Sequence, residues 1–159
     1  MKNIILILTL SFFLFSCKKN KENNDLPDTK NHIAKVTDTT LINGVLLELM
    51  ENNGKAELRV NSKTYTLSGN IKVNPPCYFL RNGNKKSESF SYPDIKVDHT
   101  LIILGNIEKQ DSDKICGKGL QGIIFKNDSI IITSKTLQHS FACADTGTDE
   151  KNFWGFAHD

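Results

Sequence analysis

The chain has 159 residues, 38% of them hydrophobic and 24% charged, so it is long enough for one globular domain and too short for two. Its formal net charge is only +2, and Arg59 and Arg81 are its only arginines. No stretch interleaves basic and aromatic residues, which argues against the basic stacking surface of a nucleic-acid-binding protein. We therefore expect one domain and no nucleic-acid partner.

The first 16 residues have the pattern of a secretory leader. Lys2 precedes an apolar segment, residues 4–15, which only Thr9 and Ser11 interrupt. A helix of that length spans about 18 Å, short of the ~30 Å hydrocarbon core of a bilayer. We therefore expect residues 1–16 to be a signal peptide that is removed, and not a permanent membrane span.

Residues 14–17, Leu-Phe-Ser-Cys, end the apolar segment on a cysteine that follows a small residue. This motif resembles the lipobox of bacterial lipoproteins. The resemblance implies cleavage before Cys17, diacylglycerol attachment to its sulfur and acylation of its new amino group. Two or three acyl chains anchor a protein stably, whereas one anchors it only marginally. The alternative is an ordinary secretory peptide that is cut at another small residue.

The resemblance also bears on the destination of the chain. Lys18, and not an aspartate, follows Cys17, which in lipoprotein sorting signals favours the outer membrane over the inner one. Residues 17–30 are polar and mixed in charge, as expected of an acylated tether. Residues 31–159 then form a single β-rich domain, which carries equal numbers of basic and acidic residues and encodes no strong electrostatic attraction to a charged partner.

Short strands and turns dominate the pattern of the domain. Apolar residues alternate with polar ones at Leu58/Val60, Tyr65/Leu67 and Ile71/Val73, which predicts half-exposed strands. Turn-forming pairs at residues 53–54, 82–83 and 127–128 predict three hairpins; they read Asn-Gly, Asn-Gly and Asn-Asp.

Two apolar runs, residues 101–104 and 130–132, predict strands that are covered on both faces. A sheet would cover one face of each strand, and a helix or a second sheet would cover the other. About eight strands in this length predict an all-β fold, a small antiparallel barrel or sandwich. The glycines of the G-x-G-x-x-G run, residues 117–122, have no βαβ unit around them, so we expect a bend or bulge there and no dinucleotide site.

The C-terminal segment has helical spacing. Phe153, Phe156 and Ala157 recur at three- and four-residue intervals, and Thr148 precedes them as a potential N-cap. We expect one short helix over residues 149–158, with its aromatic side on the sheet. Trp154 and Tyr92 are the candidate interface anchors, but aromatic residues lie in the core more often, so we expect both there.

Three cysteines remain if Cys17 carries lipid, so at least one stays unpaired within the chain. The predicted hairpin at residues 127–128 folds Cys116 back toward Cys143, which makes Cys116–Cys143 the preferred disulfide and Cys77 the unpaired thiol. The two other pairings, which involve Cys77, remain alternatives. Oxidation is permitted beyond the inner membrane.

The cysteines and histidines offer one candidate catalytic pair and one candidate metal site. A Cys77 thiol activated by His99 or His139 is the minimum for acyl transfer, but no glycine-rich oxyanion segment accompanies it. His139, Cys143 and His158 lack a second compact ligand pair such as C-x-x-C. We expect neither a catalytic residue, a metal nor a cofactor, and hence a protein that is not an enzyme.

Three function classes follow for a lipid-anchored domain in the cell envelope. The leading one is a non-enzymatic binding module whose ligand is an envelope protein or glycan. Its variant is an inhibitor or immunity lipoprotein directed at an envelope hydrolase, which is an analogy of size and β content only. The second class is a structural subunit that joins an envelope complex through an exposed strand edge. The third, an enzyme, is disfavoured.

Overall fold

The structure is a computed structural model that describes residues 34–108 and 114–159. The chain divides into the units Met1–Lys30 and Asn31–Asp159, and the second is described here by itself. The predicted signal peptide and tether, with Cys17, lie outside the described residues. Among the described residues, no helix has the length and apolar character needed to cross a membrane.

Strands make up most of the described chain, which confirms the all-β prediction. They are followed by one helix near the C-terminus. In chain order the elements are β1 (Lys35–Ile42), β2 (Val45–Asn52), β3 (Lys55–Asn61), β4 (Thr66–Ser68), β5 (Tyr78–Phe79), β6 (Phe90–Tyr92), the 3₁₀ turn η1 (Pro93–Ile95), β7 (Val97–Ile107), β8 (Cys116–Lys126), β9 (Ser129–Cys143) and α1 (Glu150–Ala157).

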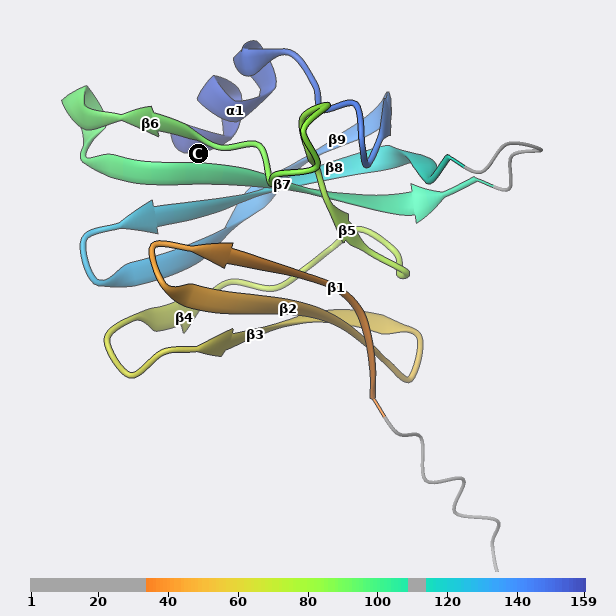
Figure 1. Cartoon of the computed structure of the whole chain (residues 1–159), viewed down its shortest axis with the longest axis horizontal. Coiled ribbons are helices and arrows are strands. Elements are labelled where there is room, and N and C mark those ends of the chain that lie inside the picture. The colour runs from red at the N-terminus through yellow and green to blue at the C-terminus, as the bar shows by residue number, and fades with distance from the viewer. Residues whose placement is uncertain (1–33, 109–113) are drawn as a thin grey trace, which may run out of the picture. The chain divides into compact units, whose positions relative to one another are not determined.

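The strands form two sheets that lie one over the other (Figure 1). The first is the meander β1-β2-β3, and the second has the order β4-β9-β8-β7-β5, with β6 also paired to β7. Together they curl into a half-barrel. Every strand pair is antiparallel except β4 with β9, which is parallel because the chain crosses from the first sheet to reach the far edge of the second.

Two of the three predicted hairpins are confirmed. Asn53 and Gly54 join β2 to β3 with φ angles of 50° and 73°, as a two-residue type I′ turn requires. Asn127, with φ 53°, opens the turn between β8 and β9. A further Asn-Gly pair, Asn43-Gly44, makes the same kind of turn between β1 and β2 and was not among the predictions.

The segment around Asn82-Gly83 is a wider loop than predicted. The Asn82 N–H donates to the Lys86 carbonyl, and the left-handed residue is Lys85, at φ 61°. An antiparallel bridge between Arg81 and Ser87 closes this loop, so the chain does reverse here as predicted. The named strands β5 and β6 on either side of it pair with β7.

The second sheet is buried on both faces, as the apolar runs predict. On β7, Leu101 and Ile103 pack toward the first sheet, whereas Ile102 and Leu104 pack toward α1. All four side chains are at most 1% exposed. Alternation along one strand thus supplies two separate hydrophobic layers, which explains why the sequence shows a continuous apolar run there.

The helix α1 covers the outer face of this sheet. Its N-cap is Asp149, one residue later than the predicted Thr148, and the Asp149 carboxylate accepts a hydrogen bond from the Lys151 N–H. Phe153 and Phe156 are fully buried. Trp154 is 54% exposed, so the prediction that it lies in the core is wrong.

Close contact between α1 and the sheet requires a residue without a side chain. A Cβ atom on Gly122 would lie only 2.6 Å from the Phe156 Cβ. The register of β8 with β9 shifts on either side of this region, between Gly117 and Gly119 and between Gln121 and Ile123, which confirms the predicted bulge. The glycine run therefore serves packing.

Replacing Phe153 by alanine should destabilise the domain strongly. Removal of a fully buried phenyl ring leaves a cavity and costs about 3–5 kcal/mol of unfolding free energy. Trp154→Ala, on the exposed side of the same helix, is the matched control and should cost about 1 kcal/mol or less. Urea unfolding of the two variants measures the difference; equal midpoints would contradict the packing role of α1.

Candidate binding groove

The half-barrel is open between β3 and β4, because each is an edge strand. β3 pairs with β2 alone, and β4 pairs with β9 alone. The chain passes from one to the other through residues 62–65 and then continues along the opening as residues 69–75.

The outer edge of β3 presents unpaired backbone groups. Asn52 and Lys55 close a two-residue turn and so form a hydrogen-bonded pair, and alternation then directs the N–H and C=O of Ala56, Leu58 and Val60 away from β2. Within the described chain, no hydrogen bond outside the β2–β3 ladder reaches these three residues. An unpaired row of this kind is a template for another strand.

Two connected hollows lie beside this edge, of about 450 Å³ and about 190 Å³. Both are lined by Ala56, Glu57, Asn70 and Ile71, so they form one groove, which we call the β3-edge groove. Its remaining lining residues are Gly54, Lys55, Leu58, Leu67, Gly69, Lys72, Val73, Asn74, Pro75 and Ile132.

The far wall of the groove is held by Gln121, a fully buried polar residue on β8. Its Oε1 accepts the Lys72 N–H at 2.7 Å, and its Nε2 donates to the carbonyls of Asn70 at 3.0 Å and Thr133 at 2.7 Å. A side-chain amide thus replaces the strand partner that this segment lacks. Gln121 itself is fully buried, so leaving its side-chain amide unpaired would cost about 1–3 kcal/mol.

Asn106, on β7, holds the other end of the wall. It exchanges two hydrogen bonds with Asn74: its Oδ1 accepts the Asn74 N–H at 2.8 Å, and its own N–H donates to the Asn74 carbonyl at 3.0 Å. The predicted strand at Ile71/Val73 is therefore wrong. Ile71 is half-buried and Val73 is buried at a bend, and Gln121 and Asn106 bind the backbone of their neighbours Asn70, Lys72 and Asn74 in place of an adjacent strand.

Gly69 lets the chain enter this wall. Its φ of 86° is left-handed, and any side chain at this position would collide with the Ile132 carbonyl. A glycine is required on both counts.

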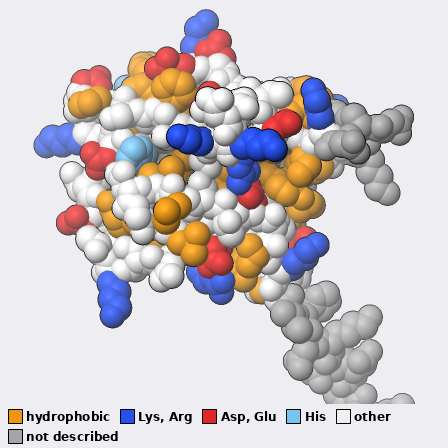
Figure 2. Space-filling view, in the orientation of Figure 1, with side chains coloured by type: hydrophobic (Ala, Val, Ile, Leu, Met, Phe, Trp, Pro, Cys, Tyr) orange, Lys and Arg blue, Asp and Glu red, His pale blue; other side chains and the backbone are white. Residues whose placement is uncertain are grey.

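The groove carries more positive than negative charge. Lys55 and Lys72 are exposed on its two sides, and the Lys72 ammonium also donates to the Ser134 carbonyl at 2.7 Å. Its single lining carboxylate, Glu57, accepts a hydrogen bond from the Asn52 amide at 3.1 Å. On the face in Figure 2, by comparison, basic, acidic and hydrophobic side chains are interspersed.

A second hollow of about 440 Å³ lies between β1 and the loop at residues 81–87. Arg81 reaches it but is engaged by Asp38 in a two-pronged ion pair with both N–O distances at 2.7 Å. This hydrogen bonding raises the pKa of Arg81, and Asp38 also accepts the Phe79 N–H at 2.8 Å. The pair joins the first sheet to β5, which is a structural role.

The cysteines follow the preferred pairing. Cys116 and Cys143 are opposite each other on β8 and β9 and form a disulfide, which rules out the two pairings of Cys77 with either of them. A bridge across 27 residues stabilises by about 3.5 kcal/mol in the chain-entropy model. Cys77 is the one unpaired cysteine of the described part of the chain.

The environment of Cys77 is unsuited to nucleophilic chemistry. The side chain is 1% exposed, and burial together with the negative charge of Glu51 raises the pKa of the thiol to about 12. His99 hydrogen-bonds the Asn43 amide at 2.8 Å, and no described hydrogen bond links Cys77 to a histidine. The thiol therefore stays protonated at neutral pH.

The three residues weighed as zinc ligands are not assembled. Cys143 is committed to the disulfide, and His158 stacks on Trp154 with ring centroids 4.0 Å apart. Across residues 34–108 and 114–159, no three His, Cys, Asp or Glu side chains lie close enough to hold a metal.

Comparisons with protein-family models, with curated proteins and with solved structures found no match for this chain. The groove must therefore be interpreted from its own chemistry. Sequence reasoning missed Gln121 and Asn106, which shape it. A signal exists for Gln121, since it is the one polar side chain in the run Leu120–Phe125, where an uncompensated amide would be costly.

Iodoacetamide should alkylate Cys77 slowly in the folded protein. At pH 8 a thiol with a pKa of about 12 is almost wholly protonated, so we expect at least ~100-fold slower labelling than in denaturant. Mass spectrometry of the labelled peptide measures both rates, and the Cys116–Cys143 peptides serve as an unlabelled control. Folded-state labelling faster than that of an ordinary thiol would contradict this and revive the nucleophile hypothesis.

Proposed function

We propose that the protein is an outer-membrane-anchored bacterial lipoprotein whose β-rich domain is a non-enzymatic binding module in the cell envelope. The lipobox-like residues 14–17 support the anchor, and Lys18 supports the outer membrane. The partner is an envelope protein or glycan. A tether of about a dozen polar residues would keep the domain close to the membrane while it captures this partner.

The observation that carries the binding role is the β3-edge groove. It combines an unpaired strand edge with a wall that Gln121 and Asn106 hold in place. A preorganised wall supports binding because little ordering entropy is lost when a ligand enters. The protonated, buried Cys77 supports the non-enzymatic reading.

A structural subunit of an envelope complex is the second candidate. The same unpaired edge of β3 favours it, since two proteins can join through a shared sheet. The two candidates differ in solution, because a subunit should co-purify with a fixed partner and a binder should be isolated alone.

Metabolic labelling with palmitate tests the anchor. The wild-type protein should incorporate label and fractionate with outer membranes, whereas Cys17→Ala should lose both properties because the acceptor sulfur is absent. Cys77→Ala is the matched control and should retain both. A wild-type protein that stays unlabelled, or a Cys17→Ala variant that fractionates unchanged, would contradict the lipoprotein assignment.

Affinity capture tests the binding role. Protein lacking residues 1–20 should be monodisperse in size-exclusion chromatography and should retain one envelope component from an extract. A stable hetero-oligomer throughout purification would favour the structural subunit. Turnover of an envelope substrate by the purified domain would overturn both non-enzymatic candidates.

A further inference from the structure

We propose that the β3-edge groove binds an extended peptide segment of a partner protein, which adds to β3 as a strand and places an acidic side chain near Lys55 and Lys72. This assignment rests on the proposed binding function and names its ligand class as polypeptide rather than glycan.

The backbone of β3 favours a peptide. Ala56 and Leu58, which line the groove, and Val60 beyond them each direct one donor and one acceptor away from β2, at the regular spacing of alternate residues in a strand. Only another extended backbone matches that row group for group. The seven residues of β3 extend over about 23 Å, so a segment of similar length would use the whole edge.

The wall selects a single strand over a folded domain. Residues 70–75 run beside the edge and are fixed to the second sheet through Gln121 and Asn106, so they do not swing away readily. A second copy of this protein would bring its own Lys55 next to its own β3 edge, so like charges would meet in the shared groove. An acidic peptide strand brings the opposite charge.

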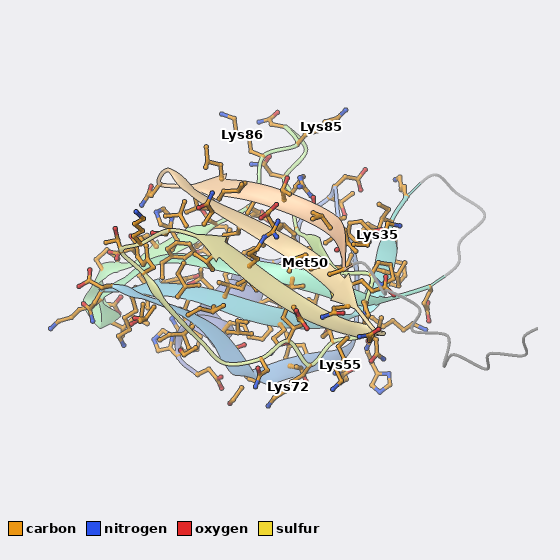
Figure 3. All side chains as sticks on the ribbon, turned by 90° about the horizontal axis from the view of Figure 1, so that it is seen from below. Lys35, Met50, Lys55, Lys72, Lys85 and Lys86 are labelled. Carbon is orange, nitrogen blue, oxygen red and sulfur yellow. A yellow bond between two sulfur atoms is a disulfide. The ribbon has the colours of Figure 1, made fainter. Side chains whose placement is uncertain are left out.

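Charge complementarity favours an acidic side chain in the peptide. Lys55 and Lys72 both line the larger hollow, and Figure 3 shows both at the same margin of the domain. The Lys72 ammonium donates one hydrogen bond to the Ser134 carbonyl and keeps two further N–H donors for a ligand. Glu57 is the only carboxylate in the lining, and it is hydrogen-bonded by the Asn52 amide. Between these charges, the half-buried Ala56 and Ile71 offer an apolar surface for an uncharged neighbour of the acidic residue.

The test uses the full-length protein, purified in detergent, and a display library of linear peptides about twelve residues long as the probe. Selected peptides should be rich in β-branched residues and contain Asp or Glu. On binding, they should slow amide hydrogen exchange at Ala56, Leu58 and Val60, which exchange rapidly in the free protein because their N–H groups are unpaired. Glu57 and Arg59, already paired with β2, should change little.

Two variants with matched controls locate the site. Lys55→Glu combined with Lys72→Glu should weaken the selected peptides by about tenfold or more. Lys85→Glu combined with Lys86→Glu makes the same charge change on the opposite margin of Figure 3 and should not. Ala56→Pro should abolish binding while preserving the fold, because it removes an N–H that points away from β2. Circular dichroism checks that the fold is preserved. If Ala56→Pro does not fold, the lysine variants decide the question.

Several results would overturn the proposal. The first is a peptide library that yields no binder. The second is a set of peptides whose affinity does not change in the Lys55→Glu, Lys72→Glu variant. The third is slower amide exchange at another place, for example at the hollow beside Lys85. Protection of the same amides that rises with protein concentration alone would assign the edge to a second copy. Palmitate labelling and envelope capture are independent of these outcomes, so their success would leave the proposed lipoprotein binder intact if the peptide assignment failed.

Discussion

The buried amide of Gln121 is the constraint on which the open half-barrel depends. The segment that follows β4 runs beside the second sheet without a strand partner, and Val73 within it is buried whereas Asn70, Lys72 and Asn74 are exposed. Gln121 satisfies this backbone at two residues, Asn70 and Lys72, and its remaining proton binds Thr133. The segment therefore stays in place as a wall without pairing to β3, and the edge of β3 remains available.

Other interactions fix the rest of the domain around this opening. The Asp38–Arg81 ion pair holds β1 against β5 on the opposite side from β3, so one margin of the first sheet is fastened and the other is open. The Cys116–Cys143 bridge joins the ends of the two long strands β8 and β9. The aromatic face of α1 seals the second hydrophobic layer.

Backbone groups, the asparagines Asn70 and Asn74 and two lysines are among the lining of the groove, whereas the Cys77 thiol is buried and protonated. A strand edge gives affinity through main-chain hydrogen bonds, and the side chains beside it give selectivity. Selectivity here would come from Lys55 and Lys72, because the domain as a whole carries no net charge to attract a partner from a distance.

Local patterns in the sequence determined the all-β class, the C-terminal helix and the two-sided burial of residues 101–104. They also determined the hairpins at Asn53-Gly54 and Asn127-Asp128 and the Cys116–Cys143 pair. Turn geometry and strand alternation depend on near neighbours, which is why these features can be predicted locally. Only the tertiary structure decided the parallel pairing of β4 with β9, the exposure of Trp154 and the groove. Ile71/Val73 alternates as a strand does, yet the residues around it are bound by distant side chains: Lys72 by Gln121, 49 residues away, and Asn74 by Asn106, 32 residues away. Which polar side chain reaches across such a distance depends on how the sheets stack, and no local period encodes that.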